Sequence, residues 1–390
     1  MSPVRTRRWD GTVLVGSGGG TVEEPDDLFI SGLNEEGVIS TTQPTIPTWD
    51  NTGHTGTLTA YTGPNAGGLL NVNVAGTIFE NVDFGNTRVK VNVPNVSFIN
   101  CRWDVTNCPS DGYAATQVDF RPSGNTGGGY MYKCTLENVA QNIRGRNGVM
   151  GWNVTIKRCR VRGFVDNFGF YVPGTPGVNS LPSGIDIIDT YIGEVAWCQH
   201  NVGGVVHISD TKTHSDCIQF QGGSGARIIN TAIIGQFSTT VGTGTPGSGS
   251  DTGWPDMPYT QAEGEAMRYA TVQGGGTYAT PGTRGYNMGG SISGIMVNTS
   301  TSKGQVLGYE LHWVYGSGGA YWLNSAGTTI GNWGTINHLR IVDDQRVTSS
   351  GLGVAVAITP GTSLTMTDAY YAADSTSWAS TGTVITRRNT

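Results

Sequence analysis

The residues best suited to acid–base chemistry gather between Glu194 and Asp216. This stretch holds half of the six histidines of the chain, and its titratable residues are Glu194, His200, His207, Asp210, His214 and Asp216. His214 and Asp216 are two positions apart, so on a β-strand both side chains would project from the same face. A carboxylate beside an imidazole raises the pKa of the histidine and orients its ring. The stretch is therefore the first candidate for a functional site.

Carboxylates in this stretch could act on or bind a polysaccharide. Asp210 beside Asp216 would supply the paired carboxylates that glycoside hydrolysis uses. We therefore take His214, Asp216 and Asp210 as candidate catalytic residues, and His207, Gln219 and Glu194 as candidate ligand-binding residues. Two other interpretations stay open: these groups could bind a sugar without turnover, or form a hydrogen-bonded structural ladder. No spacing among the histidines and aspartates is specific for a metal, and we expect no cofactor.

Aromatic residues near a long unpatterned segment are the second indication of a ligand. Sugar rings present apolar C–H faces that pack well on aromatic rings. Trp197, Trp254 and Tyr259 are therefore candidate ligand-binding residues. The alternative is that these aromatic side chains pack the long segment onto the body of the protein.

The composition limits which elements can position these residues. Of 390 residues 60 are glycine, and only 13% are charged. Low charge with many glycine, threonine, asparagine and serine residues favours β-structure with many turns over a helix bundle or coiled coil. The formal net charge of −6 gives no electrostatic footprint for nucleic acid. No segment reaches the roughly 18 apolar residues of a membrane helix, so we expect no membrane insertion.

One short template recurs along the chain and predicts the fold. It consists of alternating apolar residues, a polar corner, a small residue and a further apolar position, as in VSFINCRW, VTIKRCRV and IDIIDTYI. The corners fall 19 to 41 residues apart, at Asn81, Asn100, Lys133, Arg158, Asp189 and Asn230. Each corner should adopt the left-handed conformation, which Asn and Asp tolerate best and which Lys133 and Arg158 suit poorly. Repeats of this kind are typical of a solenoid with a variable loop in each turn.

The predicted fold class is all-β: a right-handed parallel β-helix with an N-terminal arm and cap and a C-terminal strand-rich cap. We place the arm at 1–55 and the β-helix at 56–345, with a long loop insertion near 239–286 that carries one short helix. Residues 346–390 would form the C-terminal cap or an intersubunit segment. A β-sandwich is the alternative, but the Asn-Gly dipeptides of tight hairpins are rare here.

Three cysteines occupy the same template position, directly after a corner. Cys101, Cys134 and Cys159 should therefore stack on one another inside the core. The chain has no C-x-x-C pair, and its N-terminus does not match a secretory signal peptide, so we expect folding in a reducing cytoplasm. These cysteines are predicted to be buried and reduced.

The runs TIFENVDF, NVSFINCRW and THSDCIQFQGGSGARIINTAI resemble the pectin-lyase-like β-helices of bacteriophage minor tail proteins and tailspikes. The similarity covers about residues 70–240. The segment His214 to Gln219 resembles the H-x-D-G-I-Q motif of these proteins, with Cys217 where glycine is usual.

The resemblance implies a virion tail protein, assembled in the host cytoplasm as a homotrimer, that contacts other phage tail proteins and binds host cell-wall polysaccharide. Because the family also contains polysaccharide hydrolases, lyases and inert rods, a polysaccharide-degrading enzyme on the same scaffold is the alternative function.

Overall fold

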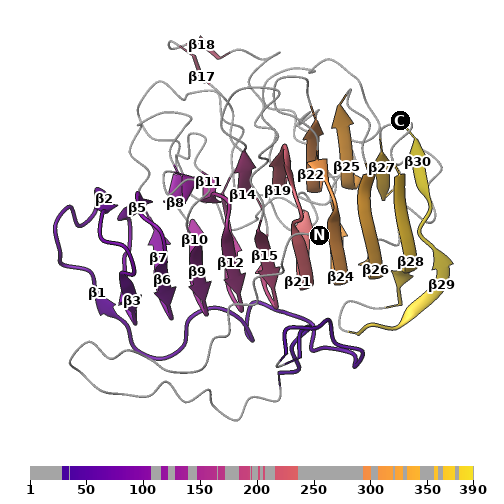
Figure 1. The fold of residues 1–390 in the computed structure, drawn as a ribbon, viewed down its shortest axis with the longest axis horizontal. Coiled ribbons are helices and arrows are strands. Elements are labelled where there is room, and N and C mark those ends of the chain that lie inside the picture. The colour runs from indigo at the N-terminus through magenta and orange to yellow at the C-terminus, as the bar shows by residue number, and fades with distance from the viewer. Residues whose placement is uncertain are drawn as a thin grey trace.

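The computed structural model describes residues 29–34, 36–106, 116–121, 128–138, 147–164, 166–171, 184–193, 195, 201–202, 205–206, 216–235, 293–299, 306–318, 321–327, 332–342, 355–358, 363–373 and 377–389. Its elements in these residues are all β-strands, and almost all of them pair in parallel within stacked sheets (Figure 1). The protein is therefore all-β, as the composition indicates.

The strands form three rows, which we call A, B and C. Row A contains β3 (Ile78–Glu80), β6 (Val96–Ile99), β9 (Gly129–Tyr132), β12 (Val154–Lys157) and β15 (Ile185–Ile188). Row B contains β1 (Thr59–Ala60), β4 (Val82–Asp83), β7 (Arg102–Val105), β10 (Thr135–Asn138), β13 (Arg160–Arg162) and β16 (Tyr191–Ile192). Four longer strands continue both rows: β21 (Arg227–Gly235), β24 (Tyr309–Gly318), β26 (Asn332–Val342) and β28 (Ser363–Ala372).

Row C is the second large sheet. Its strands are β2 (Leu69–Val72), β5 (Arg88–Val91), β8 (Thr116–Asp119), β11 (Asn147–Met150), β14 (Asp166–Tyr171), β19 (Asp216–Gln221), β22 (Ser293–Thr299), β25 (Tyr321–Gly327), β27 (Val356–Ile358) and β30 (Arg387–Asn389). The chain visits rows A, B and C in the same order in each repeat, so strands that pair lie one repeat apart in the sequence.

A few strands lie outside the rows. The short strands β17 (Asn201–Val202) and β18 (Val205–Val206) pair antiparallel, and β20 (Gly223–Ser224) pairs in parallel with β23 (Val306–Leu307). At the C-terminal end, β29 (Ser380–Val384) pairs antiparallel with β28. The C-terminal segment from 346 thus contributes β27, β28 and β30 to the rows. The segment predicted as a long loop, 239–286, lies outside the described residues.

The corner between rows A and B has the predicted backbone conformation. All six predicted corner residues have a positive φ, between 45° at Asn230 and 55° at Asn81, and Lys133 and Arg158 are among them. The backbone of each corner is held by the next repeat: the amide of Asn100 donates to the Tyr132 carbonyl, and that of Lys133 to the Lys157 carbonyl. Interstrand hydrogen bonds therefore enforce the left-handed corner even where the side chain does not favour it. Trp313, His338 and Asp368 continue the corners in the later repeats.

The position after the corner explains the stacked cysteines. Cys101, Cys134 and Cys159 have no exposed surface and are free, which confirms that they are buried and form no disulfide. Each thiol donates to the carbonyl of the residue two positions earlier, with Sγ–O distances of 3.3, 3.4 and 3.4 Å. Thr190 and Thr231 hold the same position in the next two repeats and donate to the equivalent carbonyls at 2.8 and 3.1 Å. A small side chain with one donor satisfies this site, so either Cys or Thr can occupy it.

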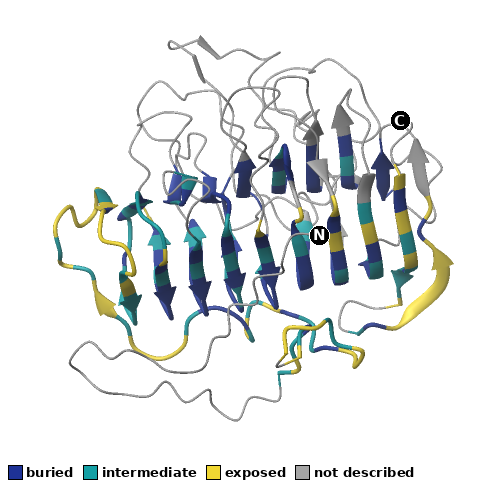
Figure 2. Ribbon diagram, viewed as in Figure 1, coloured by how far each residue is buried: buried dark blue, intermediate teal, exposed yellow. Residues whose placement is uncertain are grey.

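The core lies between the three rows (Figure 2). Inward positions are filled by valine, isoleucine and aromatic side chains, which stack on equivalents one repeat away. Phe79 lies parallel to Phe98 with ring centroids 5.2 Å apart, and Phe170 stacks on Phe220 at 5.1 Å. Like side chains on parallel neighbouring strands therefore bury one continuous apolar column.

Residues 29–58 run along the outside of the row A–B corners, beneath the strands in Figure 1, and we call them the strap. One part binds early repeats, where the amide of Thr55 donates to Asn100 Oδ1 at 2.8 Å. Another part binds the last repeats, where Trp378 Nε1 donates to the Pro44 carbonyl at 2.8 Å. The described part of the predicted N-terminal arm thus lies along the flank of the stacked strands.

Between these ends, the strap closes over a buried carboxylate. Asp189 has no exposed surface and accepts hydrogen bonds from Ser31 Oγ, from the amide of Gly32 and from Asn230 Nδ2, at 2.5, 2.8 and 2.8 Å. Gly32 is needed at this crossing because a Cβ there would lie 2.5 Å from Asn230 Cβ. Two of these three donors belong to the strap, so the buried carboxylate keeps all of its hydrogen bonds only when the strap is in place.

Candidate functional site

The longest connections of the chain join row B to row C. Residues 194–215 lead into β19, and residues 236–292 lead into β22. Rows A and B, by contrast, are joined by one or two residues, the corner and in most repeats the small residue after it. Since β19 and β22 are neighbours in row C, both long connections enter the sheet at adjacent strand starts.

Most predicted site residues belong to these two connections. Glu194, Trp197, His207, Asp210 and His214 belong to the first, and Trp254 and Tyr259 belong to the second; all seven lie outside the described residues. Asp216 and Gln219 are described, and both belong to β19. Of the predicted site residues, the structure therefore describes only these two, and both lie on one strand of row C.

Asp216, a candidate catalytic residue, is the first residue of β19 and is fully buried. It pairs in register with Asp166, the first residue of β14, which is 4% exposed. The amide of Asp216 donates to Asp166 Oδ1 at 3.2 Å. The two carboxyl-bearing residues therefore begin neighbouring strands at the same end of row C.

Asp166 is a candidate that the sequence analysis missed. The strands β14 (DNFGFY) and β19 (DCIQFQ) both begin with Asp and carry Phe at the fifth position. The similarity between these two six-residue sequences could have identified Asp166 as the partner of Asp216. The similarity is hard to recognise because the two strands are 50 residues apart, with a long connection between them.

Gln219 lies on the outer face of β19. Its neighbours Ile218 and Phe220 are buried in the core, whereas Gln219 is partly exposed. Gly169 on β14 lies beside it in register, and Met296 on β22 lies on the other side. Because glycine carries no side chain, β14 contributes none beside Gln219 at this register position.

Cys217 stands where the resembled motif has glycine. Its side chain is buried, and the carbonyl oxygens of Ile234 and Gly193 lie 3.2 and 3.6 Å from Sγ, so its single S–H can donate to either. Both acceptors lie where row B ends. The cysteine therefore ties the start of β19 to row B, a role that glycine could not perform.

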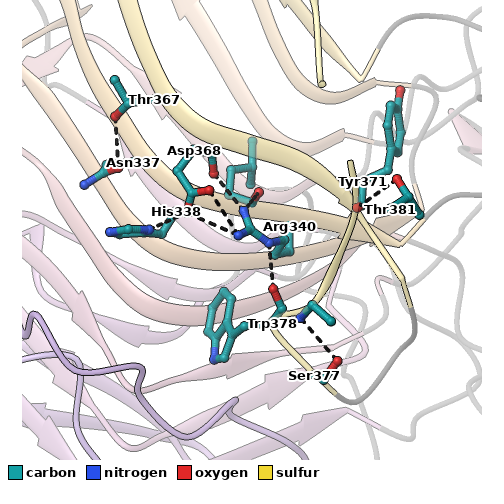
Figure 3. Close-up of polar contacts among 11 residues, drawn as sticks. Asn337, His338, Arg340, Thr367, Asp368, Tyr371, Ser377, Trp378 and Thr381 are labelled. Carbon is teal, nitrogen blue, oxygen red and sulfur yellow. Dashed lines mark hydrogen bonds and ion pairs between the residues drawn. The ribbon is translucent and has the colours of Figure 1, made fainter. Parts of the chain in front are cut away.

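A separate polar cluster lies near the C-terminal end (Figure 3). Arg340 Nη2 contacts the two carboxylate oxygens of Asp368 at 3.1 and 3.2 Å, and Arg340 Nε donates to the Trp378 carbonyl at 2.8 Å. Asp368 also binds His338 Nδ1. The imidazole of His338 stacks on Trp313, with centroids 3.9 Å apart and planes 11° apart.

This cluster has the contacts of a structural clamp. Arg340 fixes the turn at Trp378, which connects β28 to β29, and Asp368 orients the His338 ring. A carboxylate that orients a histidine occurs in hydrolytic sites, but here Asp368 also binds Arg340, and the His338 ring is covered by Trp313. We therefore assign the cluster to stability. The sequence analysis missed it because Trp and His are unusual corner residues.

Within the described residues, no group of three or more His, Cys, Asp or Glu side chains is arranged to hold a metal ion, and no helix could span a membrane. No protein-family model matches the chain, and the searches of curated proteins and of solved structures find no match.

Proposed function

We propose that the chain is a right-handed parallel β-helix of the kind found in bacteriophage tail proteins, and that it binds host cell-surface polysaccharide along row C. The proposed β-helix is supported by the fixed order in which the chain visits three rows of parallel strands. It is also supported by the recurring left-handed corner between rows A and B.

The observation that carries the proposed ligand site is the convergence of the long connections on row C. Residues 194–215 and 236–292, which hold the predicted polar and aromatic residues, enter adjacent strands β19 and β22. Loops that are joined to a rigid sheet are a common way to build a binding site. Gln219 is the described side chain best placed to contact a sugar from the sheet itself.

The test is binding of purified bacterial cell-wall polysaccharides, presented as a panel, to wild type and to Gln219→Ala. Loss of one sugar hydrogen bond should weaken binding about tenfold while the fold is retained, because Gln219 is not part of the apolar core. Thr155→Ala, on the partly exposed outer side of β12 in row A, is the matched control and should bind as wild type does. Wild type that binds no member of the panel, or equal loss in both variants, would contradict the proposal.

A second candidate function is polysaccharide hydrolysis or lysis, and Asp166 is the observation that favours it. The pair Asp166–Asp216 places two carboxyl groups on neighbouring strands at the same end of row C. Paired carboxylates with different protonation states are what a hydrolase uses. New reducing ends from a polysaccharide that the protein binds, lost in both Asp166→Asn and Asp216→Asn, would select this function over binding alone.

We also propose that the chain assembles as a homotrimer with other tail proteins in the virion. The strand β29, near the C-terminal end, is exposed at all five residues and, among the described strands, pairs only with β28 (Figure 2). An exposed strand at a sheet edge offers unpaired backbone groups to another chain. Light scattering at micromolar concentration should give about three times the chain mass of 41.1 kDa, and a stable monomer would oppose the assignment.

A further inference from the structure

His54 joins the strap to the wall of row B through one buried hydroxyl. The hydroxyl belongs to Thr135 on β10, which is 2% exposed. The backbone amide of His54 donates to Thr135 Oγ1 at 3.0 Å, and Arg160 Nε on β13 donates to the same oxygen at 3.0 Å. His54 Nδ1 lies 2.7 Å from it.

The protons of this contact can be assigned by counting. A hydroxyl oxygen has two lone pairs and one hydrogen. Both lone pairs of Thr135 Oγ1 are used by the two N–H donors, so its hydrogen must point to His54 Nδ1. That nitrogen is therefore an acceptor, which makes the imidazole neutral with its proton on Nε2.

A protonated His54 would not fit this site. Its Nδ1–H would face a hydroxyl that already accepts two hydrogen bonds, and the existing bond would be lost. The charged groups that act on the ring are Arg160 on β13, Arg102 on β7 and Asp83 on β4. Burial, followed by the two arginines, lowers the pKa of His54, and Asp83 opposes them with a smaller effect.

We propose that His54 is an acid-sensitive latch, which holds the strap against β10 and β13 while its imidazole is neutral and releases this part of the strap when it is protonated. Three consecutive strap amides would be freed together. Those of Gly53, His54 and Thr55 donate to the Arg158 carbonyl, Thr135 Oγ1 and Asn100 Oδ1. Release would uncover the corners of the early repeats and leave the anchor at Asp189, which does not involve His54.

The direction of the pH effect follows from proton binding. The folded, latched state binds a proton less readily than the free strap, whose histidine has an ordinary pKa near 6.5. The latch is therefore fully stable above that value and weakens as the pH falls through it. Its equilibrium constant for closing should fall by about tenfold per pH unit until the pH reaches the lowered pKa of the latched state.

The test measures hydrogen exchange of the amides at 53–55 in the full chain, as protection factors between pH 7.5 and pH 5 so that intrinsic exchange cancels. We expect protection to fall several-fold or more on acidification in wild type. His54→Asn is the decisive variant, because Asn Oδ1 can accept from Thr135 Oγ1 but cannot be protonated, and its protection should stay constant. The amide of Ser97, which donates to the Thr77 carbonyl away from the strap, is the internal control.

Two results would overturn the latch. One is protection of the three amides in wild type that does not depend on pH. The other is an equal loss in wild type and His54→Asn, which would assign the effect to other groups such as His338. If His54→Asn folds poorly, the pH dependence of amide protection in wild type still tests the latch. A loss of protection whose midpoint lies at or above pH 6.5 would contradict a lowered pKa of His54.

Discussion

At the residue scale, one hydrogen bond explains why chemically different side chains occupy equivalent positions. Cysteine and threonine follow the corners because each can donate to the carbonyl two residues earlier while it fills a small inward site. The cysteines are therefore structural donors rather than reactive thiols. Burial raises the pKa of the Cys101 and Cys134 thiols well above the ordinary value, which suppresses the reactive thiolate.

We therefore predict that threonine can replace cysteine at the position after a corner. Cys159→Thr should fold with nearly wild-type stability, since Thr190 in the next repeat already uses the same hydrogen bond. Cys159→Ala loses both the donor and part of the packing, and should lower the free energy of unfolding by about 1 kcal/mol. Urea unfolding measures both. Equal destabilisation of the two variants would show that the thiol itself, and not the shared donor, is required.

At the element scale, the corners show how far sequence can predict this fold. The left-handed conformation of Asn81, Asn100, Asp189 and Asn230, and the inward cysteines, follow from residue preferences acting over a few positions. The corners at Trp313 and His338 do not, because pairing with neighbouring repeats imposes that backbone on these residues.

Local sequence patterns also do not predict the pairing of Asp166 with Asp216 or the path of the strap. Both depend on contacts between residues far apart in the sequence, such as Ser31 with Asp189 and Pro44 with Trp378. The strap lacks the repeating template, so no periodicity could align it with the corners.

Two substitutions at one corner separate the backbone contribution from the side-chain contribution. Asn100 has φ of 50°, donates to Asn81 Oδ1 at 2.7 Å and binds Thr55 in both directions. Asn100→Gly loses these bonds but keeps an unstrained corner, whereas Asn100→Ala loses the bonds and strains the backbone. The strain of about 1–2 kcal/mol exceeds the entropic cost of glycine, about 0.5–1 kcal/mol, so the alanine variant should be the less stable by roughly 0.5–1 kcal/mol. Denaturant midpoints measure the difference, and a more stable alanine variant would contradict the assigned strain.

At the scale of the whole molecule, the strap changes how the repeats depend on one another. Stacked repeats that contact only their neighbours can unfold piece by piece from either end. The strap contacts early, middle and late repeats, and it forms part of the smaller apolar cluster around Trp313, Tyr315 and Trp378, through Ile39 and Ile46. It should therefore couple repeats that otherwise share no contact.

Removal of the strap tests this coupling. A chain that starts at residue 59 leaves Asp189 without Ser31 and Gly32, and uncovers Ile229, against which Gly32 lies. We expect a lower urea midpoint and separate transitions by tryptophan fluorescence and by circular dichroism, because the two ends of the stack would then unfold independently. A chain that starts at residue 29 keeps the strap and is the control, with coincident transitions expected. If the shorter chain instead unfolds in one coincident transition at the midpoint of the control, cooperativity resides in the rows, and the strap serves only the local contacts at its anchors.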